Sequence, residues 1–347
     1  MGPEYQCTLD RREMAVLHEL ASEVAGLVPG APDRVGNVLD EVPAGLRRPL
    51  AALAEPDRAP FHCLVDVSEH EPLTALPPTP TADSPAPGGH WSAGLLLLVA
   101  ELLGDLVGYA DENDGALIHE VSPEPGMEEC IQNVGSSSLG LHTENVHHPL
   151  RPDFVSLLCL RQDPDDAAAL RISSARDAVR QLTPGTLDVL REPLFRSLYP
   201  TSFGLDAEGR RPVSAPHPVL AGAPDAPTVR YNTHNTTAVT GHAARALASF
   251  GDALDRASRR IRLRPGQLAV LDNRSVVHGR TAFTPRYDGR DRWLRRCYSL
   301  SGVPRGLSGL MPRPRVIPRL PSLLKSLDGL GPEPGTTPRP GPEGGPR

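Results

Sequence analysis

The sequence has few cysteines, and no pattern among them marks a disulfide-rich or zinc-binding protein. Its five cysteines, at positions 7, 63, 130, 159 and 297, are widely scattered, odd in number and without a Cys-x-x-Cys pair. Neither a disulfide framework nor a structural zinc site is therefore expected. Such isolated thiols are typical of a reducing compartment, and we expect a cytoplasmic protein.

Long apolar runs and a surplus of positive charge are also missing. The most apolar run, from Gly94 to Leu103, is about half as long as a membrane helix and contains Glu101. The N-terminus shows no basic segment followed by an apolar one, as a signal peptide would. The formal net charge of -6 gives no reason to expect nucleic acid as a partner. We therefore expect contact with neither a membrane nor nucleic acid.

Proline is the residue in surplus, and its distribution divides the chain. The 39 prolines are well above ordinary usage, which indicates long irregular stretches beside a folded core. We expect an N-terminal helical section with a Pro-rich linker at 1–92, a core at 93–302 and a Pro/Gly/Arg-rich, partly disordered tail at 303–347. Apolar periodicity predicts helices over Arg11–Leu27 and Ala93–Tyr109.

Within the core, short apolar runs separated by turn residues predict β-strands. Such runs are Phe154–Leu160, Leu268–Leu271 and Val276–Val277, and strands at this spacing are typical of an antiparallel sandwich or barrel. One predicted helix, near 242–261, interrupts them and has apolar residues along one face. The predicted fold class is therefore mainly β with flanking helices (α+β).

The segment Leu141-His142-Thr143-Glu144 places an imidazole and a carboxylate two residues apart. In extended chain, residues i and i+2 lie on the same face, so both side chains can reach one metal ion. His278 supplies a second imidazole near the end of a predicted strand. Two histidines and one carboxylate form the facial triad of non-haem iron(II) oxygenases, which leaves positions open for a bidentate co-substrate and dioxygen.

Each of these residues alone is weak evidence, because His-x-Glu segments are common and most of the 12 histidines are expected to be structural or exposed. Two arginines strengthen the case. In a strand, Arg292 and Arg296 share one face and Arg295 takes the other. Unless this is a solvated edge strand, inward guanidinium groups need anionic partners, and arginine binds carboxylates through two hydrogen bonds. Beside iron, they predict one carboxylate on a co-substrate and one on a substrate.

A more specific pattern lies in four stretches, Ile131–Ser136, His142–Arg161, Asn273–Arg280 and Pro285–Arg296. In composition, in order and in the fourteen residues from the second triad histidine to the first arginine, it resembles the clavaminate synthase-like oxygenases of the TauD/TfdA-type superfamily. These include asparagine and arginine β-hydroxylases of peptide antibiotic pathways. The resemblance covers about residues 95–302 and implies a double-stranded β-helix (jelly roll).

The resemblance also implies iron(II) as the metal, 2-oxoglutarate as the co-substrate and O2 as the oxidant. His142, Glu144 and His278 would bind the iron. In such enzymes, the arginine at the position of Arg292 holds the distal carboxylate of 2-oxoglutarate. The arginine at the position of Arg296 holds the α-carboxylate of an amino-acid substrate, and the glutamate ligand commonly also contacts the substrate amine.

Further substrate contacts follow from the same resemblance. Asn133 matches a residue that orients the substrate, and Glu120 is a candidate for binding the amine. Asn232 and His234 lie in the loop Arg230–Asn235, which is expected to close over the substrate side chain. Relatives that hydroxylate guanidine or amine substrates carry acidic residues in this loop. Its neutral polar groups therefore disfavour free arginine or lysine as the substrate.

One position departs from the family pattern. The family usually has a threonine about 28 residues after the first triad histidine, where it helps the arginine to hold 2-oxoglutarate. This chain has Leu170 there, which cannot donate a hydrogen bond. Either Ser173 or Ser174 compensates, or the co-substrate binds more weakly.

We therefore expect a 2-oxoglutarate-dependent hydroxylase that acts on the β-carbon of an amino acid, either free or tethered to a carrier protein. Related iron sites also desaturate, cyclise or epoxidise, which leaves a second enzymatic reading open. A reading of another class is a non-catalytic jelly-roll binding module, for which Leu170 is the one argument. A third is a scaffold whose Pro/Arg-rich tail recruits a partner.

Overall fold

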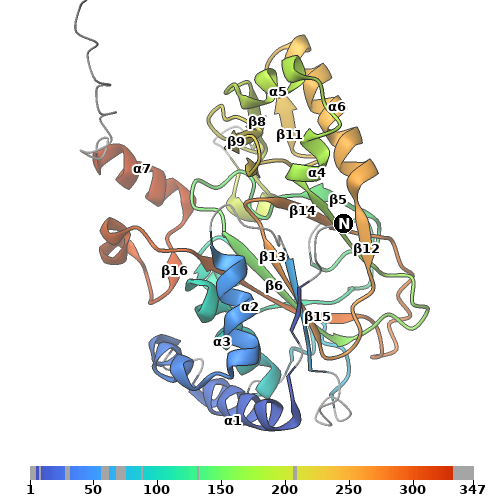
Figure 1. Cartoon of the computed structure of the whole chain (residues 1–347), viewed down its shortest axis with the longest axis vertical. Coiled ribbons are helices and arrows are strands. Elements are labelled where there is room, and N and C mark those ends of the chain that lie inside the picture. The colour runs from blue at the N-terminus through green and yellow to red at the C-terminus, as the bar shows by residue number, and fades with distance from the viewer. Residues whose placement is uncertain are drawn as a thin grey trace, which may run out of the picture.

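The fold consists of two β-sheets between two layers of helices (Figure 1). A computed structural model describes residues 5–7, 9–27, 32–55, 62–67, 76–86, 89–130, 133–205 and 209–330. The α-helices are α1 (Arg11–Leu27), α2 (Ala44–Ala54), α3 (Trp91–Leu103), α4 (Ala175–Val179), α5 (Pro184–Arg191), α6 (Gly241–Ala257) and α7 (Leu320–Leu330). Shorter 3-10 helices lie at Pro32–Glu41, Asn113–Gly115, Thr201–Phe203 and Arg305–Leu310. Among the described residues, no helix is long and apolar enough to cross a membrane.

The strands fall mainly into a larger and a smaller sheet. They are β1 (Tyr5–Cys7), β2 (His62–Asp66), β3 (Asp105–Tyr109), β4 (His119–Val121), β5 (Leu139–His142), β6 (Phe154–Arg161), β7 (Leu170–Ser174), β8 (Phe195–Ser197), β9 (Leu220–Gly222), β10 (Pro227–Val229), β11 (Thr236–Ala238), β12 (Arg259–Ile261), β13 (Gln267–Asp272), β14 (Val276–Arg280), β15 (Trp293–Leu300) and β16 (Val316–Ile317). The larger sheet has the order β1-β2-β13-β6-β15-β3-β16, with β4 also on β15, and the smaller has the order β12-β7-β14-β5. The predicted fold class, mainly β with flanking helices, is confirmed.

The apolar run at Phe154–Arg161 is continuous because both faces of β6 are buried. Leu158 and Leu160 lie in the apolar cluster that helices α1–α3 form with the larger sheet. Leu157 and Cys159, which alternate with them, lie in the cluster between the two sheets. A third cluster joins the outer face of the smaller sheet to α4, α5 and α6. The two inner faces therefore enclose the space in which a site can form.

The helix predicted over Ala93–Tyr109 is shorter than expected. Helix α3 ends at Leu103, and the next residues form strand β3. Gly104 separates them with a φ of 149°, a value that favours glycine. A Cβ at Gly104 would lie 2.1 Å from the carbonyl oxygen of Leu300, so the strand approaches β15 too closely for any side chain there.

The N-terminal section contributes to the core as well as covering it. Helix α1 spans the predicted Arg11–Leu27, but β2 pairs with β13 of the larger sheet and β1 pairs with β2. In the Pro-rich linker, the hydroxyl of Thr79 donates to the carbonyl of Asp291 at 2.7 Å. The section predicted at 1–92 is therefore continuous with the core. Residues 68–75 and 87–88 of that linker lie outside the described residues.

Two other boundaries also differ from the prediction. The inserted helix is α6, which ends at Ala257, since Arg259–Ile261 pairs with β7 as strand β12. In the tail predicted from 303, β16 pairs with β3 and is followed by helix α7. The first part of this tail is thus ordered against the core. Residues 331–347 lie outside the described residues.

Candidate metal centre and substrate pocket

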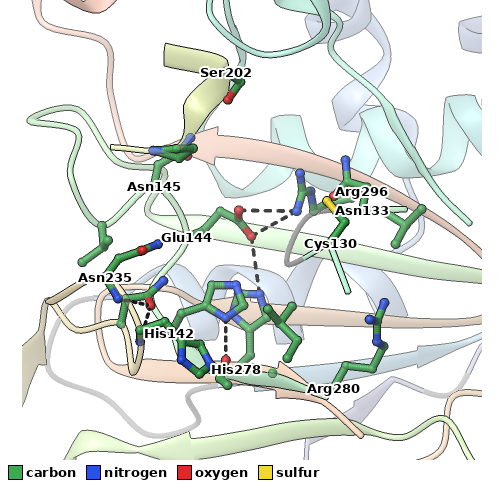
Figure 2. A pocket seen from close by; sticks show the side chains of 18 of the residues that line it. Cys130, Asn133, His142, Glu144, Asn145, Ser202, Asn235, His278, Arg280 and Arg296 are labelled. Carbon is green, nitrogen blue, oxygen red and sulfur yellow. Dashed lines mark hydrogen bonds and ion pairs between the residues drawn. The ribbon is translucent and has the colours of Figure 1, made fainter. Parts of the chain in front are cut away.

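A cavity of about 540 Å³ opens between the two sheets. Strands β4, β5, β14 and β15 contribute side chains to it, and the segments 127–130, 198–202 and 232–235, together with Asn133, complete its wall. Figure 2 shows the polar side chains that point into this space, and they come from segments far apart in the sequence. The predicted triad lies in this cavity.

His142 and His278 are brought together by strand pairing. His142 ends β5, and His278 lies directly opposite it on β14. Their ring centroids are 4.4 Å apart. Glu144 follows β5 by two residues, and its Oε2 lies 3.4 Å from Nε2 of His278. Ligand atoms of all three side chains lie within 4.8 Å of one another, as one metal ion requires (Figure 2).

Backbone and side-chain hydrogen bonds orient these ligands. The carbonyl of Gly140 accepts a hydrogen bond from Nδ1 of His142 at 2.9 Å, which leaves Nε2 available to a metal. The backbone N–H of Glu144 donates to Oδ1 of Asn273 at 2.8 Å. Asn273 in turn donates through Nδ2 to the carbonyl of Pro152 at 2.7 Å. Such supporting contacts fix the direction of a ligand and stabilise a metal site.

The charge states of the triad suit iron(II). Burial, together with neighbouring His278, lowers the pKa of His142 to about 4, so its imidazole is neutral at pH 7. Burial disfavours the charged form of Glu144, but Arg296 and the two histidines outweigh it and hold the pKa of this carboxyl below its usual range. Two imidazoles and one carboxylate on one face fit the ligand set of a non-haem iron(II) ion.

The arginines alternate about β15 as predicted. Arg292, just before the strand, and Arg296 both line the cavity and are buried. Nη1 of Arg296 lies 3.3 Å from Oε2 of Glu144. Arg295 points away from the cavity, toward helix α3, where its Nη1 donates to the hydroxyl of Ser92 at 2.8 Å. Two guanidinium groups, each of a geometry that can bind a carboxylate through two hydrogen bonds, thus line the cavity that holds the triad.

Residues 97–298 match the family described as "Taurine catabolism dioxygenase TauD, TfdA family". The chain belongs to this family. It is 41% identical over 313 residues to the L-asparagine oxygenase of Streptomyces coelicolor, an alignment that covers 88% of this chain and 92% of that protein. The resemblance inferred from the four motif stretches is confirmed.

Solved structures agree with this assignment. A structure of asparagine oxygenase with Fe(II), 2S,3S-3-hydroxyasparagine and succinate matches with a TM-score of 0.83 and 38% identity, covering 91% of this chain and 99% of that one. The non-heme iron oxygenase OrfP with Fe and alpha-ketoglutaric acid matches with a TM-score of 0.78 and 26% identity, covering 91% and 100%. This TauD/TfdA dioxygenase therefore has the jelly-roll core and uses iron and 2-oxoglutarate, and the non-catalytic reading is set aside.

Glu120 of the dioxygenase does not lie where it was predicted. Its carboxylate accepts hydrogen bonds from Nε1 of Trp293 and from Nε of Arg295, on the side of β15 that faces the helices. The preceding residue, His119, lines the cavity instead. Successive residues of a strand point to opposite faces, so a displacement of one position changes the face. The prediction that Glu120 binds the substrate amine is therefore corrected.

The other predicted substrate residues do line the cavity. Asn133 lies on its wall near Arg296 in Figure 2. Asn232 forms an isolated antiparallel bridge with His142, so its loop runs beside the metal ligands. His234 lies over Gly140, because a Cβ at that glycine would be 2.7 Å from its Nε2. All three side chains therefore border the space beside the triad.

Several cavity residues of the dioxygenase were not predicted, although Asn235 and Arg280 lie in stretches that the sequence analysis singled out. The most polar of them are Glu112, His119, Arg211, Asn235 and Arg280. Each reaches the cavity through long-range pairing or a loop contact. Leu170 lines the cavity too, as the family threonine would. The two serines proposed to compensate do not, since Ser173 donates to the carbonyl of Leu254 and Ser174 caps helix α4.

Proposed function

We propose that this dioxygenase hydroxylates the β-carbon of a free α-amino acid whose short side chain carries hydrogen-bond acceptors. The single observation that carries the proposal is the distribution of polar groups in the cavity. Arg296 and His119 line the cavity beside the carboxylates of Glu144 and Glu112, and a second set of donors comes from Arg211 and from the loop that holds Asn232 and Asn235. They match, in turn, an α-carboxylate, an amine and a side-chain amide or carboxylate.

A pair of unpartnered donors supports binding of the α-carboxylate. Arg296 and His119 face each other in the pairing of β15 with β4. Nε of Arg296 and Nε2 of His119 are both buried without a hydrogen-bond partner among the described residues. Burial lowers the pKa of His119 to about 3, so its ring is neutral, and Nδ1 lies 3.0 Å from the side-chain amide of Asn113. If that amide donates, Nε2–H is free to donate to an anion.

Two carboxylates support binding of the amine. Glu144 and Glu112 both line the cavity. Burial disfavours the charged form of Arg296, but these two carboxylates favour it and raise the pKa of Arg296. Burial raises the pKa of Glu112, and the hydroxyl of Tyr298 donates to its Oε2 at 3.3 Å. A buried carboxylate gains stability from a cation beside it. An ammonium group next to Arg296 would therefore complete an arrangement that fits the zwitterionic end of an amino acid.

The part of the cavity wall formed by the 232–235 loop and Arg211 favours a substrate whose side chain accepts hydrogen bonds. Oδ1 of Asn232 accepts from the backbone N–H groups of His234 and Asn235, both at 2.9 Å. Because backbone N–H groups only donate, this contact fixes the amide and leaves Nδ2 as the free donor. Arg211 donates to Oδ1 of Asn235 at 3.1 Å, which orients that amide in the same way. A wall of donors favours a carbonyl or carboxylate and disfavours the cation of lysine or arginine.

The chemical step divides between the cofactors and the chain. Iron and 2-oxoglutarate, when bound, supply the oxidation of a C–H bond by dioxygen. The chain holds the substrate by the carboxylate and the amine on its α-carbon, which directs the β-carbon toward the triad. The buried wall of the cavity limits access of water to the reacting atoms. The similarity to an L-asparagine oxygenase is consistent with a substrate that has a short polar side chain.

The test is release of succinate from 2-oxoglutarate by the iron-loaded enzyme with a panel of L-amino acids. Asparagine, aspartate and their one-carbon-longer homologues should support turnover, whereas lysine and arginine should not. The product should be heavier than the substrate by one oxygen atom, and a loss of two hydrogens would identify desaturation instead. His142→Ala should abolish turnover with every substrate. Turnover with lysine or arginine above that with asparagine and aspartate would contradict the proposal.

A free substrate is distinguished from a carrier-bound one by its α-carboxylate. The matched probes are the preferred amino acid and its methyl ester, which lacks the negative charge that Arg296 would bind. Arg296→Gln should raise KM for the acid by about tenfold or more and leave KM for the ester little changed. Efficient use of the ester by the native enzyme, together with turnover of an aminoacyl carrier protein, would favour a tethered substrate.

A further inference from the structure

A third arginine, Arg280, lies in the cavity and has no role in the proposals above. It follows His278 by two residues on β14, so both side chains point to the inner face. Arg280 is 6% exposed, and within the described part of the chain its guanidinium makes one hydrogen bond, from Nη2 to the carbonyl of Ser137 at 2.8 Å. Its Nε is buried without a partner among the described residues.

Arg280 and Arg292 form a pair of like charges. Both guanidinium groups lie over the ring of Phe283, at 5.2 Å and 5.9 Å from its centroid. Neither makes an ion pair with a carboxylate in the described part of the chain. Two buried cations this close are costly unless an anion binds to them.

The position of this pair relates directly to the missing family threonine. Arg280 and Leu170 are direct cross-strand partners in the pairing of β14 with β7. Leu170 also lines a small recess together with Arg292. The leucine thus adjoins both guanidinium groups, at the place where the family threonine would help to hold 2-oxoglutarate. Neither Ser173 nor Ser174 reaches the cavity to replace that hydroxyl.

We propose that Arg280 binds the distal carboxylate of 2-oxoglutarate together with Arg292 and so replaces the hydroxyl that Leu170 lacks. The free Nε and the second terminal nitrogen of Arg280 supply the hydrogen bonds. A guanidinium donates charged hydrogen bonds, which are stronger than that of a threonine hydroxyl. Arg280 is therefore a positioning residue for the co-substrate, and the substitution at Leu170 does not indicate a loss of binding.

The test is an anaerobic titration of the iron(II)-loaded protein, followed by the visible charge-transfer band of the chelate. The two probes are 2-oxoglutarate and 2-oxopentanoate, which has the same length but a methyl group in place of the distal carboxylate. Arg280→Gln should raise the dissociation constant of 2-oxoglutarate by about tenfold to a hundredfold and leave that of 2-oxopentanoate nearly unchanged. No amino acid is needed, so the result does not depend on the proposed substrate.

A matched control and a rescue variant sharpen the test. Arg171 lies opposite Gly279 in the same strand pair, but its Nη2 bonds Asp255 at 2.8 Å outside the cavity. Arg171→Gln makes the same change of charge and should leave both titrations unchanged. Adding Leu170→Thr to Arg280→Gln should recover part of the affinity for 2-oxoglutarate, because it restores the family hydroxyl.

The other outcomes overturn the proposal. Equal weakening of both probes by Arg280→Gln would mean that Arg280 only maintains the shape of the site. Unchanged binding of 2-oxoglutarate, with or without a raised KM for the amino acid, would exclude the co-substrate contact. If the glutamine variant does not fold, Arg280→Lys replaces it, because lysine keeps the charge. Arg280→Lys should weaken the binding of 2-oxoglutarate by less than the factor expected for Arg280→Gln. If Arg280→Lys weakened the binding of 2-oxoglutarate and 2-oxopentanoate equally, that result would also contradict the proposal.

Discussion

The two faces of strand β15 hold arginines in opposite states. On the outer face, Arg295 donates to Glu120 at 3.0 Å and to Ser92 at 2.8 Å, so its charge and most of its donors are satisfied by the protein. On the inner face, Arg292 is 8% exposed and has no ion pair within the described residues. The sequence of the strand alone does not distinguish these states.

The difference indicates what each arginine is for. A buried cation with a complete set of protein partners contributes to the folded structure, and its removal leaves a partner unpaired. A buried cation without such partners is stable only if a ligand supplies the anion. The inner face therefore holds binding residues, and the outer face holds a structural ion pair. Loss of an inner arginine should weaken a ligand, and loss of the outer one should weaken the fold.

The largest effect is expected from Arg292→Gln on the inner face. This change removes the main cationic contact proposed for the distal carboxylate and should raise the dissociation constant of 2-oxoglutarate by about a hundredfold. Affinity for iron(II) should stay unchanged, because the triad does not contact this residue through any hydrogen bond. The anaerobic charge-transfer titration measures both quantities. A variant that unfolded readily yet bound 2-oxoglutarate normally would reverse the assignment of the two faces.

Arg295→Met on the outer face should act on stability. It leaves the partly buried carboxylate of Glu120 without its cation and should lower the free energy of unfolding by about 2–4 kcal/mol. Denaturation by urea measures this change. The double variant with Glu120→Gln should recover part of the loss, because no unpaired charge remains. A large change in 2-oxoglutarate affinity, with native stability, would show that the outer pair serves the site.

A smaller effect is expected from pH, because the inner face also holds neutral histidines. The pKa of His119 is about 3 in the folded protein, against an ordinary value of 6.5. The unfolded chain therefore binds more protons between these values, so stability is present above about pH 6.5 and is lost as the pH falls toward 3. In metal-free protein, His119→Gln should reduce the loss between about pH 7 and pH 5 by about 2 kcal/mol.

Urea denaturation at several pH values in this window checks the histidine prediction. If the free energy of unfolding fell equally with decreasing pH in the native protein and in His119→Gln, the burial of this ring would not contribute to the acid sensitivity of the fold.

Two of the triad residues, His142 and Glu144, and the two family arginines could be predicted from the sequence because the spacing within each pair is local, whereas His278 was found through its fixed distance from Arg292. Glu144 is two positions after His142, and Arg296 is four positions after Arg292. Apolar runs buried on both faces, such as β6, likewise predict strands without knowledge of their partners. Together these features were sufficient for the fold class and for the centre of the site.

The rest depended on pairing between distant segments, which spacing cannot show. His119 reaches the cavity only because β4 pairs with β15 in one particular register, and the neighbouring Glu120 faces away for the same reason. Arg280 acquires its proposed role through its pairing with Leu170. The early end of helix α3 also follows from a long-range contact, the approach of Gly104 to Leu300. Register is decided by tertiary packing, not by local propensity.

The pairing of His142 with His278 has a consequence for the order in which the enzyme becomes active. During synthesis, His278 emerges 134 residues after Glu144, so a growing chain long carries two of the three ligands without the third. Two flexible ligands hold a divalent ion far less tightly than a preformed set of three, since metal binding is coupled to folding. A complete set of ligands for one metal ion therefore forms only after strands β5 and β14 have paired.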